Sequence, residues 1–395
     1  MSNDAPQIRF KGFTDAWEQR KLGEEFYKVN ERNDGSFGKQ HWISVAKMYF
    51  QDPEKVQSNN IDTRTYVMRI GDIAFEGHPN AEFAFGRFVA NDIGDGVVSE
   101  LFPIYRHKVD YDNNYWKYAI QLETIMASIF AKSITSSGNS SNKLNEKHFL
   151  RQVIFVPNFD EQQKIGTFFN TLNNLITLHK RKLDGLKELK RGYLQQMFPK
   201  VGESTPLVRF TGFTERWVEK KLGDYFSERS ERSGEGDLIS VTINSGIMKA
   251  NELDRKIISG EDKSNYKVVK VADIAYNSMR MWQGASGCSP YDGILSPAYT
   301  VITPSKNAHS HFFAYAFKRL CMIQMFQKNS QGLTSDTWNL KYPAFSRIGM
   351  FIPSLNEQIK IADFLEKLDD QIVIQQQKLN QLKQLKSAYL QKMFV

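Results

Sequence analysis

The sequence has little that would place it among secreted, membrane or metal-binding proteins. Its 395 residues include only two cysteines, Cys288 and Cys321, whose spacing matches neither a metal-ligand pair nor a redox motif, so we expect two reduced thiols. No apolar run approaches the length of a membrane span. The first ten residues lack the apolar core of a signal peptide. These absences predict a cytoplasmic protein without a membrane partner.

Catalytic motifs are also scarce. No Pro-Pro pair occurs, although the Asn/Asp-Pro-Pro-aromatic loop of adenine methylation needs one, and the stretch 296–299 (SPAY) comes nearest. The stretch 35–40 (GSFGKQ) is too short for a phosphate-binding loop and has Gln where Ser or Thr would bind magnesium. The seven histidines show no metal-ligand spacing. We expect no catalytic residue, no metal site and no bound cofactor in this chain, which would make it a non-catalytic protein.

What the chain does have is a modest excess of positive charge. Its net charge is +8, with 24% charged and 41% apolar residues, the composition of an ordinary globular protein. The length suggests two to four domains. A basic balance suits a polyanion such as nucleic acid, although many basic proteins bind none.

One line of sequence occurs twice. RFKGFTDAWEQRKLG starts at Arg9 and RFTGFTERWVEKKLG starts at Arg209, with nine of fifteen letters shared at an offset of 200. Other markers return in the same order, such as Asp-Ile-Ala at 72–74 and again at 273–275. Solenoid repeats have periods of about 20–50 residues, so a period this long predicts a repeated domain.

The likeness between the halves is uneven. Opening lines and closing segments match closely, whereas the interiors, roughly 27–143 and 227–339, match only at scattered apolar positions. A shared core requires such an apolar skeleton. Neutral drift of loops is one explanation for the rest, but the closing segments changed far less. We interpret the interiors as two different surfaces on one scaffold.

Each half closes with a predicted long helix. Strand-like residues stop at Pro157 and Pro353, and Asp160 and Asn356 are the expected caps. Apolar residues then follow alternating steps of three and four, as in a coiled-coil seam. No second metal ligand lies at helical spacing from His179, so we interpret this residue as a polar seam position that restricts register. The predicted seam contains Leu172, Ile176, His179, Leu183, Leu186, Tyr193 and Met197 in the first helix and Leu368, Ile372, Gln375, Leu379, Leu382, Tyr389 and Met393 in the second.

These helices predict the architecture. About 33 residues at 1.5 Å each make a rod of roughly 50 Å, and the second helix runs back along the first if the second domain returns the chain to its entry point. We expect an α+β fold in which two similar globular domains are separated by a pair of long antiparallel coiled-coil helices, with pseudo-two-fold symmetry. The predicted boundaries are 1–157 and 200–353 for the domains and 158–199 and 354–395 for the spacer helices.

This arrangement resembles the specificity subunit of Type I restriction–modification enzymes. The resemblance spans essentially the whole chain and rests on paired RFxGFTxxWxxxKLG lines, paired PxxxEQ helix starts and paired YLQxMF helix ends. It implies two target recognition domains, each reading one half of a bipartite, asymmetric double-stranded DNA target. It also implies helices that set the spacing and dock two methylation subunits, joined by restriction subunits in the full complex. S-adenosylmethionine, ATP and magnesium would then be used by those partners.

Candidate DNA contacts lie in polar, glycine-containing stretches of the interiors, since Arg, Lys, Asn, Gln, Ser and Thr read base edges and Arg and Lys hold phosphates. Two stretches pair across the halves at 133–143 and 329–339, and two more at 76–87 and 277–287. Ordinary solvated turns are the alternative, and Trp282 is either a stacking residue or a half-buried core aromatic. The candidates are His78, Asn80, Arg87, Ser137, Asn139, Ser140, Asn142, Lys143, Asn277, Arg280, Trp282, Gln283, Gln331, Thr334, Ser335 and Asp336, with Arg64, Arg69, Lys263 and Lys267 as phosphate contacts or a solvated face.

Two other functions stay open at this point. One is a tandem protein-binding adaptor on a coiled-coil stalk, and the other is a self-contained restriction enzyme. Binding to random duplex DNA that weakens steeply as salt rises would distinguish a DNA reader from the adaptor. Cleavage or methylation by the purified chain alone would reveal the enzyme.

Overall fold

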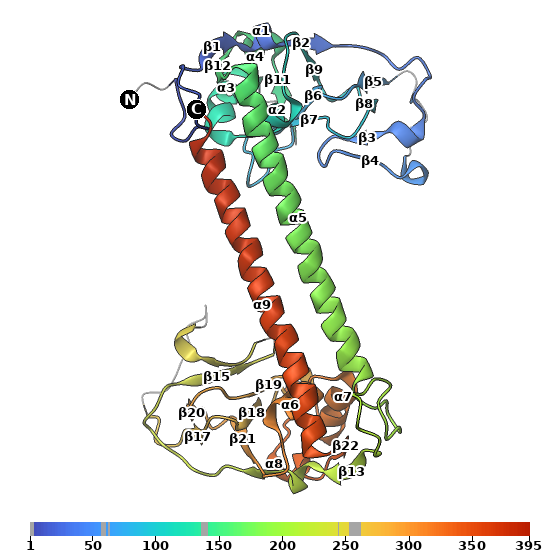
Figure 1. The fold of residues 1–395 in the computed structure, drawn as a ribbon, viewed down its shortest axis with the longest axis vertical. Coiled ribbons are helices and arrows are strands. Elements are labelled where there is room, and N and C mark those ends of the chain that lie inside the picture. The colour runs from blue at the N-terminus through green and yellow to red at the C-terminus, as the bar shows by residue number, and fades with distance from the viewer. Residues whose placement is uncertain (1–3, 57–60, 62–63, 136–140, 244, 253–261) are drawn as a thin grey trace. The chain divides into compact units, whose positions relative to one another are not determined.

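Two long helices, α5 (Phe159–Gln196) and α9 (Leu355–Lys392), each have 38 residues in this computed structural model (Figure 1). The structure describes residues 4–56, 61, 64–135, 141–243, 245–252 and 262–395. The chain divides into two units: unit 1 is Met1–Lys180 with Gln377–Val395, and unit 2 is Arg181–Gln376. Each unit therefore holds one globular stretch, the first part of one long helix and the last part of the other.

The globular stretches contain the same elements in nearly the same order. In unit 1 these are β1 (Glu18–Lys21), α1 (Leu22–Glu25), β2 (Phe26–Val29), β3 (Ile43–Ser44), β4 (Tyr49–Phe50), β5 (Thr65–Met68), β6 (Ile73–Glu76), β7 (Arg87–Ala90), β8 (Gly96–Ser99), β9 (Ile104–His107), α2 (Asn113–Ala119), α3 (Glu123–Ser133), β10 (Ile134–Thr135), β11 (Lys143–Leu144), α4 (Glu146–Arg151) and β12 (Val153–Val156). In unit 2 they are β13 (Val218–Lys221), β14 (Phe226–Glu228), β15 (Ile239–Thr242), β16 (Gly246–Lys249), β17 (Lys267–Val269), β18 (Ile274–Asn277), β19 (Ser286–Cys288), β20 (Gly293–Leu295), β21 (Tyr299–Pro304), α6 (Ser310–Phe317), α7 (Leu320–Asn329), α8 (Tyr342–Phe345) and β22 (Gly349–Ile352).

Each unit is built on an antiparallel four-stranded sheet. Its strand order is β2-β9-β6-β7 in unit 1 and β14-β21-β18-β19 in unit 2, so corresponding strands occupy corresponding places. A separate two-stranded ladder pairs the opening line with the strand that leads into the long helix, β1 with β12 and β13 with β22. Aromatic side chains fill the core between the sheet and the short helices, with Phe88 and Trp116 fully buried in unit 1 and Phe226 and Phe317 in unit 2. The repeat in sequence is thus a repeat in topology.

The long helices pack in the same way inside each unit. In unit 1, Phe168 near the start of α5 lies with its ring centroid 5.0 Å from that of Tyr389 near the end of α9. In unit 2, Phe364 near the start of α9 lies 4.8 Å from Tyr193 near the end of α5. The beginning of one helix lies beside the end of the other, so the two segments run antiparallel within each unit. The predicted α+β class, with two similar units and a pair of long helices, is confirmed.

Burial along the two helices follows the spacing of the predicted seam. Gln375, at 6% exposed, is as buried as the leucines on either side of it, which fits a polar group held within the seam. The seam residues Leu172, Leu183, Met197, Leu368, Gln375, Leu379 and Met393 are buried, while Ile176, His179, Leu186, Tyr193, Ile372, Leu382 and Tyr389 are half-buried. Among the described residues, no helix is both apolar enough and long enough to span a bilayer.

The helix starts differ from the sequence prediction. Asn158 Oδ1 accepts a hydrogen bond from Glu161 N at 2.9 Å, so Asn158 caps α5 and Asp160 lies within its first turn. In α9, Glu357 N donates to Ser354 O at 3.0 Å, which places Asn356 inside the helix as well. The predicted caps were wrong because each helix begins two residues after the proline, leaving a single linking residue.

Candidate nucleic-acid interface

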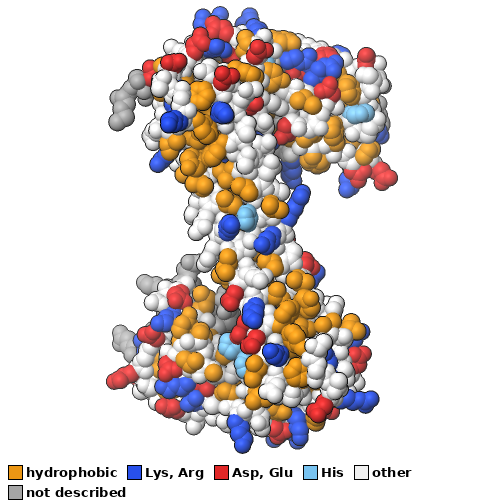
Figure 2. Space-filling view, viewed as in Figure 1, with side chains coloured by type: hydrophobic (Ala, Val, Ile, Leu, Met, Phe, Trp, Pro, Cys, Tyr) orange, Lys and Arg blue, Asp and Glu red, His pale blue; other side chains and the backbone are white. Residues whose placement is uncertain are grey.

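Positive charge is not concentrated in one broad patch on the face drawn in Figure 2. Among the described side chains there, Lys and Arg are mixed with Asp and Glu over both units. The described side chains of this face thus form no basic stripe that would mark a path for the DNA backbone. A DNA-reading site would therefore be local, in a hollow or a loop.

The repeated opening line forms a clasp on the N-terminus of each long helix. In unit 1, the Arg9 guanidinium donates to both carboxylate oxygens of Glu161, at 2.8 and 2.6 Å, and Trp17 Nε1 donates to the same carboxylate at 3.1 Å. In unit 2, Arg209 binds Glu357 at 2.8 and 2.7 Å. Both carboxylates are almost fully buried, with side chains 1% and 3% exposed. In each unit, the RFxGF line thus supplies the arginine of a bidentate ion pair and the PxxxEQ helix start supplies its glutamate.

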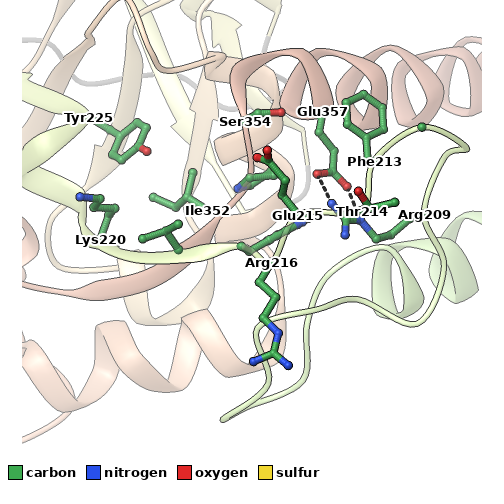
Figure 3. Close-up of a pocket in the computed structure, with 14 residues that line it drawn as sticks. Arg209, Phe213, Thr214, Glu215, Arg216, Lys220, Tyr225, Ile352, Ser354 and Glu357 are labelled. Atoms are coloured by element: carbon green, nitrogen blue, oxygen red, sulfur yellow. Dashed lines mark hydrogen bonds and ion pairs between the residues drawn. The ribbon is translucent and has the colours of Figure 1, made fainter.

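A hollow of about 470 Å³ lies beside this clasp in unit 2 (Figure 3). The Glu357 carboxylate points at Arg209, while the Arg216 side chain extends away from the pair. Half of its lining comes from residues that the first half repeats, including Phe213, Thr214 and Trp217. A site that distinguishes two different half-targets must be built from residues that differ between the units.

The repeated Asp-Ile-Ala marker is also structural. Asp72 is 1% exposed and accepts hydrogen bonds from Arg69 N at 2.8 Å and from the Arg106 guanidinium at 2.8 and 2.9 Å. Burial raises the pKa of Asp72, and the hydrogen bonds from Arg106 oppose that shift. Asp273 makes the same backbone contact, to Lys270 N at 2.8 Å, and pairs with Arg229 at 2.7 Å. The motif fixes the turn before β6 and β18, whose far ends carry candidate loops.

In unit 1, the two candidate loops meet. Asn142 N, in the loop before α4, donates to the carbonyl of Gly77, directly after β6, at 2.8 Å. The approach is close enough that a Cβ on Gly77 would lie 2.3 Å from Asn142 O, so only glycine fits. His78 Nδ1 lies 2.6 Å from Glu76 Oε1, and Asn80 Oδ1 accepts from Phe83 N at 2.9 Å. These two exposed residues are thus held by their own loop.

Unit 2 brings its loops together through an equivalent contact. Leu340 N, after the 329–339 loop, donates to Ser278 O, after β18, at 2.8 Å. Trp282 reinforces the junction: its ring lies 5.1 Å from that of Trp338 in an edge-to-face arrangement, and its Nε1 donates to Met279 O. Trp282 is half-buried, so it packs between the loops. The loop tip remains exposed at Gln331, Thr334, Ser335 and Asp336.

Three candidates of unit 2 line a single hollow of about 530 Å³. Asn277, Arg280 and Gln283 come from the loop after β18, and the β15–β16 turn forms the opposite wall. The Arg280 side chain is exposed, and its guanidinium pairs with no carboxylate among the residues that the structure describes. Asn277 Oδ1 accepts from Met279 N at 3.0 Å, so Arg280 and Gln283 are the candidates that offer polar groups to the hollow, as base-edge recognition requires. Thr242 and Ser245 of the β15–β16 wall, and Tyr299 at the start of β21, also line it and are functional candidates that the sequence did not single out.

Unit 1 has a hollow of about 430 Å³ that shares two elements with the unit 2 hollow, the turn between the third and fourth strands and the position of Arg87, while its other wall comes from β7 and the end of α2. The β3–β4 turn contributes Ala46, Lys47 and Met48, and β7 contributes Arg87. The Arg87 Nη2 atom donates to Ala46 O at 2.5 Å, and its guanidinium lies 4.9 Å from the Phe83 ring centroid. Arg87 thus holds the turn as well as lining the hollow.

The remaining candidates lie apart from these hollows. Arg69 pairs with Glu31 at 2.5 Å and with Asp95 at 3.0 Å, and Lys267 pairs with Glu228 at 3.3 Å. Arg64 and Lys143 are exposed, and Lys263 is half-buried. Ser137, Asn139 and Ser140 lie outside the described residues. All twenty candidates stay predictions; three of them meet at the unit 2 hollow, and Arg87 lines the unit 1 hollow.

The chain is similar in sequence to a known protein family and in fold to solved structures. A family model described as "Type I restriction modification DNA specificity domain" matches residues 214–384. This stretch, most of it in unit 2, is thus similar to the specificity domain of Type I restriction–modification systems. No curated protein matches the chain. The solved structure of the Type I restriction–modification S subunit from M. genitalium is 14% identical, with a TM-score of 0.58 and 99% of each chain covered.

A second solved structure, titled for complex assembly and conformational transition of the type I restriction–modification system, includes a chain that is 15% identical. Its TM-score is 0.51, covering 96% of this chain and 97% of that chain. Both likenesses extend over the two units, beyond the matched residues 214–384. The fold of a Type I specificity subunit thus accounts for the repeated topology, and the two hollows lie where the two units differ.

Proposed function

We propose that each unit reads one half of a bipartite, asymmetric DNA target, and that this chain is the non-catalytic specificity subunit of a Type I complex. The observation that carries the proposal is the position of the differences. The clasp, the Asp-Ile-Ala turn and the core repeat, whereas the loops and turns around the two hollows do not. A common frame with unlike hollows is suited to binding two unlike half-sites.

Docking of two copies of one partner is supported by the outer faces of the long helices. Leu178 and Leu189 on α5 are 61% and 46% exposed, and the repeat-equivalent Ile374 and Leu385 on α9 are 62% and 45% exposed. Exposed apolar residues that match so closely favour a face that is covered twice by the same molecule. We assign this role to two methylation subunits, with restriction subunits completing the complex. S-adenosylmethionine, ATP and magnesium would then act on those partners.

Mapping methylated bases tests the proposal. DNA from a host that expresses this chain with its methylation subunits is expected to carry modifications only at a split target, with two different half-sites separated by a fixed spacer. A continuous motif, or two identical half-sites, would contradict the assignment of one half to each unit. Host DNA with the methylation subunits alone is the control and should lack these modifications.

The salt dependence of DNA binding distinguishes the proposed function from a protein-binding adaptor. The assembled complex should lose affinity for random duplex DNA steeply between 50 and 200 mM salt, because lysines and arginines displace counterions from phosphates. Affinity that is independent of salt would favour a protein-binding adaptor.

A further inference from the structure

Lys318 is a largely buried cation that, within the part of the chain that the structure describes, donates its hydrogen bonds to backbone carbonyls. It follows α6 directly, and its Nζ donates to Ile243 O at 2.9 Å and to Gly284 O at 2.5 Å. Ile243 lies in the turn between β15 and β16. Gly284 ends the short 3₁₀ helix Met281–Gln283, in a left-handed conformation with φ of 83°. One ammonium group therefore connects the two walls of the unit 2 hollow.

Unit 1 holds its corresponding turn with a cation from a different position. There Arg87 on β7 donates to Ala46 O in the β3–β4 turn. Strand pairing and turn hydrogen bonds place Ala285 at the position of Arg87, and helix α2 places Gln121 at the position of Lys318. Each unit thus has one cation and one uncharged residue at these two positions, in exchanged order. The exchange indicates that a cation is needed at this place, whichever element provides it.

We propose that Lys318 is a positioning residue that sets the shape of the DNA-reading hollow in unit 2 and so determines which half-site is accepted. Arg87 does the same in unit 1. The inference rests on the proposed function, since it assumes that each hollow reads one half-site. Lys318 itself lies behind the hollow and does not line it. It acts by fixing the backbone that carries Thr242 on one wall and Gln283 on the other.

The effect should be confined to one half of the target. In Lys318→Met, the Ile243 carbonyl loses the ammonium donor and the Gly284 carbonyl keeps its bond from Ser286 N, so nothing from this side chain joins the turn to the 3₁₀ helix and the two are free to separate. Discrimination against single substitutions in one half-site should fall at least about tenfold, as misplaced base contacts typically cost, with the other half-site unchanged. Lys318→Arg retains donors for both carbonyls and should restore much of the discrimination. A purely structural role would lower methylation at all sites alike.

The test compares methylated sites in hosts that express the parent chain or one variant with the methylation subunits. Lys328 is an exposed lysine on α7, so Lys328→Met makes the same charge change without the contacts and should leave the target unchanged. Unaltered discrimination in a folded Lys318→Met complex would overturn the inference and leave the proposed function standing. Absence of a split target with the parent chain would instead overturn the proposed function. If Lys318→Met does not fold, Lys318→Gln, which keeps an uncharged donor at the same place, decides: relaxation of the same half-site alone supports the inference, and unaltered discrimination overturns it.

Discussion

Replacing Glu161 by alanine is expected to destabilise unit 1 by about 3–5 kcal/mol, the usual cost of removing one partner from a buried ion pair. The change leaves the Arg9 guanidinium, with its side chain 13% exposed, without its carboxylate, and Trp17 Nε1 loses its acceptor. Glu357→Ala should act in the same way on unit 2 through Arg209. Denaturant unfolding of the purified chain, or of its complex if the chain alone is insoluble, measures the loss.

Two controls sharpen this prediction. Glu188→Ala removes an exposed partner of Arg191 and should change the unfolding free energy by about 0–1 kcal/mol. The double variant Arg9→Met with Glu161→Met removes both charges and should recover part of the loss, since the cost comes mostly from an unpaired buried charge. A Glu161→Ala protein as stable as Glu188→Ala would show that the repeated motif has some purpose other than holding the helix start.

Acid should destabilise unit 1 through His107. Its imidazole is buried against Phe26 and stacked on Tyr111 with a centroid distance of 3.8 Å, and neither ring nitrogen has a partner among the described residues. Burial lowers the pKa of His107 from 6.5 to about 3. Between these values the unfolded chain binds a proton that the folded chain does not, so stability falls as the pH drops. The loss should reach about 3 kcal/mol near pH 4, at 1.36 kcal/mol per pH unit.

The measurement is the free energy of unfolding from pH 7 to pH 4. His107→Phe keeps an aromatic ring in the stack and removes the titrating group. Between pH 7 and pH 4 this variant should therefore lose about 3 kcal/mol less of its unfolding free energy than the parent. His148 is exposed, and His148→Phe should keep the parent's limb. A His107→Phe variant with an unchanged acid limb would mean that other groups govern acid unfolding.

The repeat made much of the fold predictable from sequence. Apolar spacing in steps of three and four is a local property, so α5 and α9 could be identified from the residues within each helix. Their predicted seam residues are buried or half-buried in the structure. The clasp was visible only as two paired motifs. Nothing local shows that Arg9 meets Glu161, since 152 residues separate them and the fold alone brings them together.

The candidate site was predictable to a lesser degree, for a related reason. Polar loops such as 277–287 and 329–339 could be chosen by composition, and the structure joins them through Leu340 and Ser278. Lys318 was missed because it follows an apolar helix and binds a turn 75 residues away. Arg69 is a residue type that binds phosphates, yet in the fold it pairs with Glu31, which follows another strand. Because the interiors of the two halves differ in sequence, comparing the halves does not reveal contacts of this kind.

Exchange of a single interior segment tests the central claim most directly. Residues 27–143 would be replaced by the corresponding segment of another family member with a different target, leaving the clasp and both long helices intact. Mapping methylated bases in the host should then show one half-site changed to that of the donor, with the other half-site and the spacer kept. If both half-sites change, or if neither does, the two units do not read DNA separately and the account is wrong.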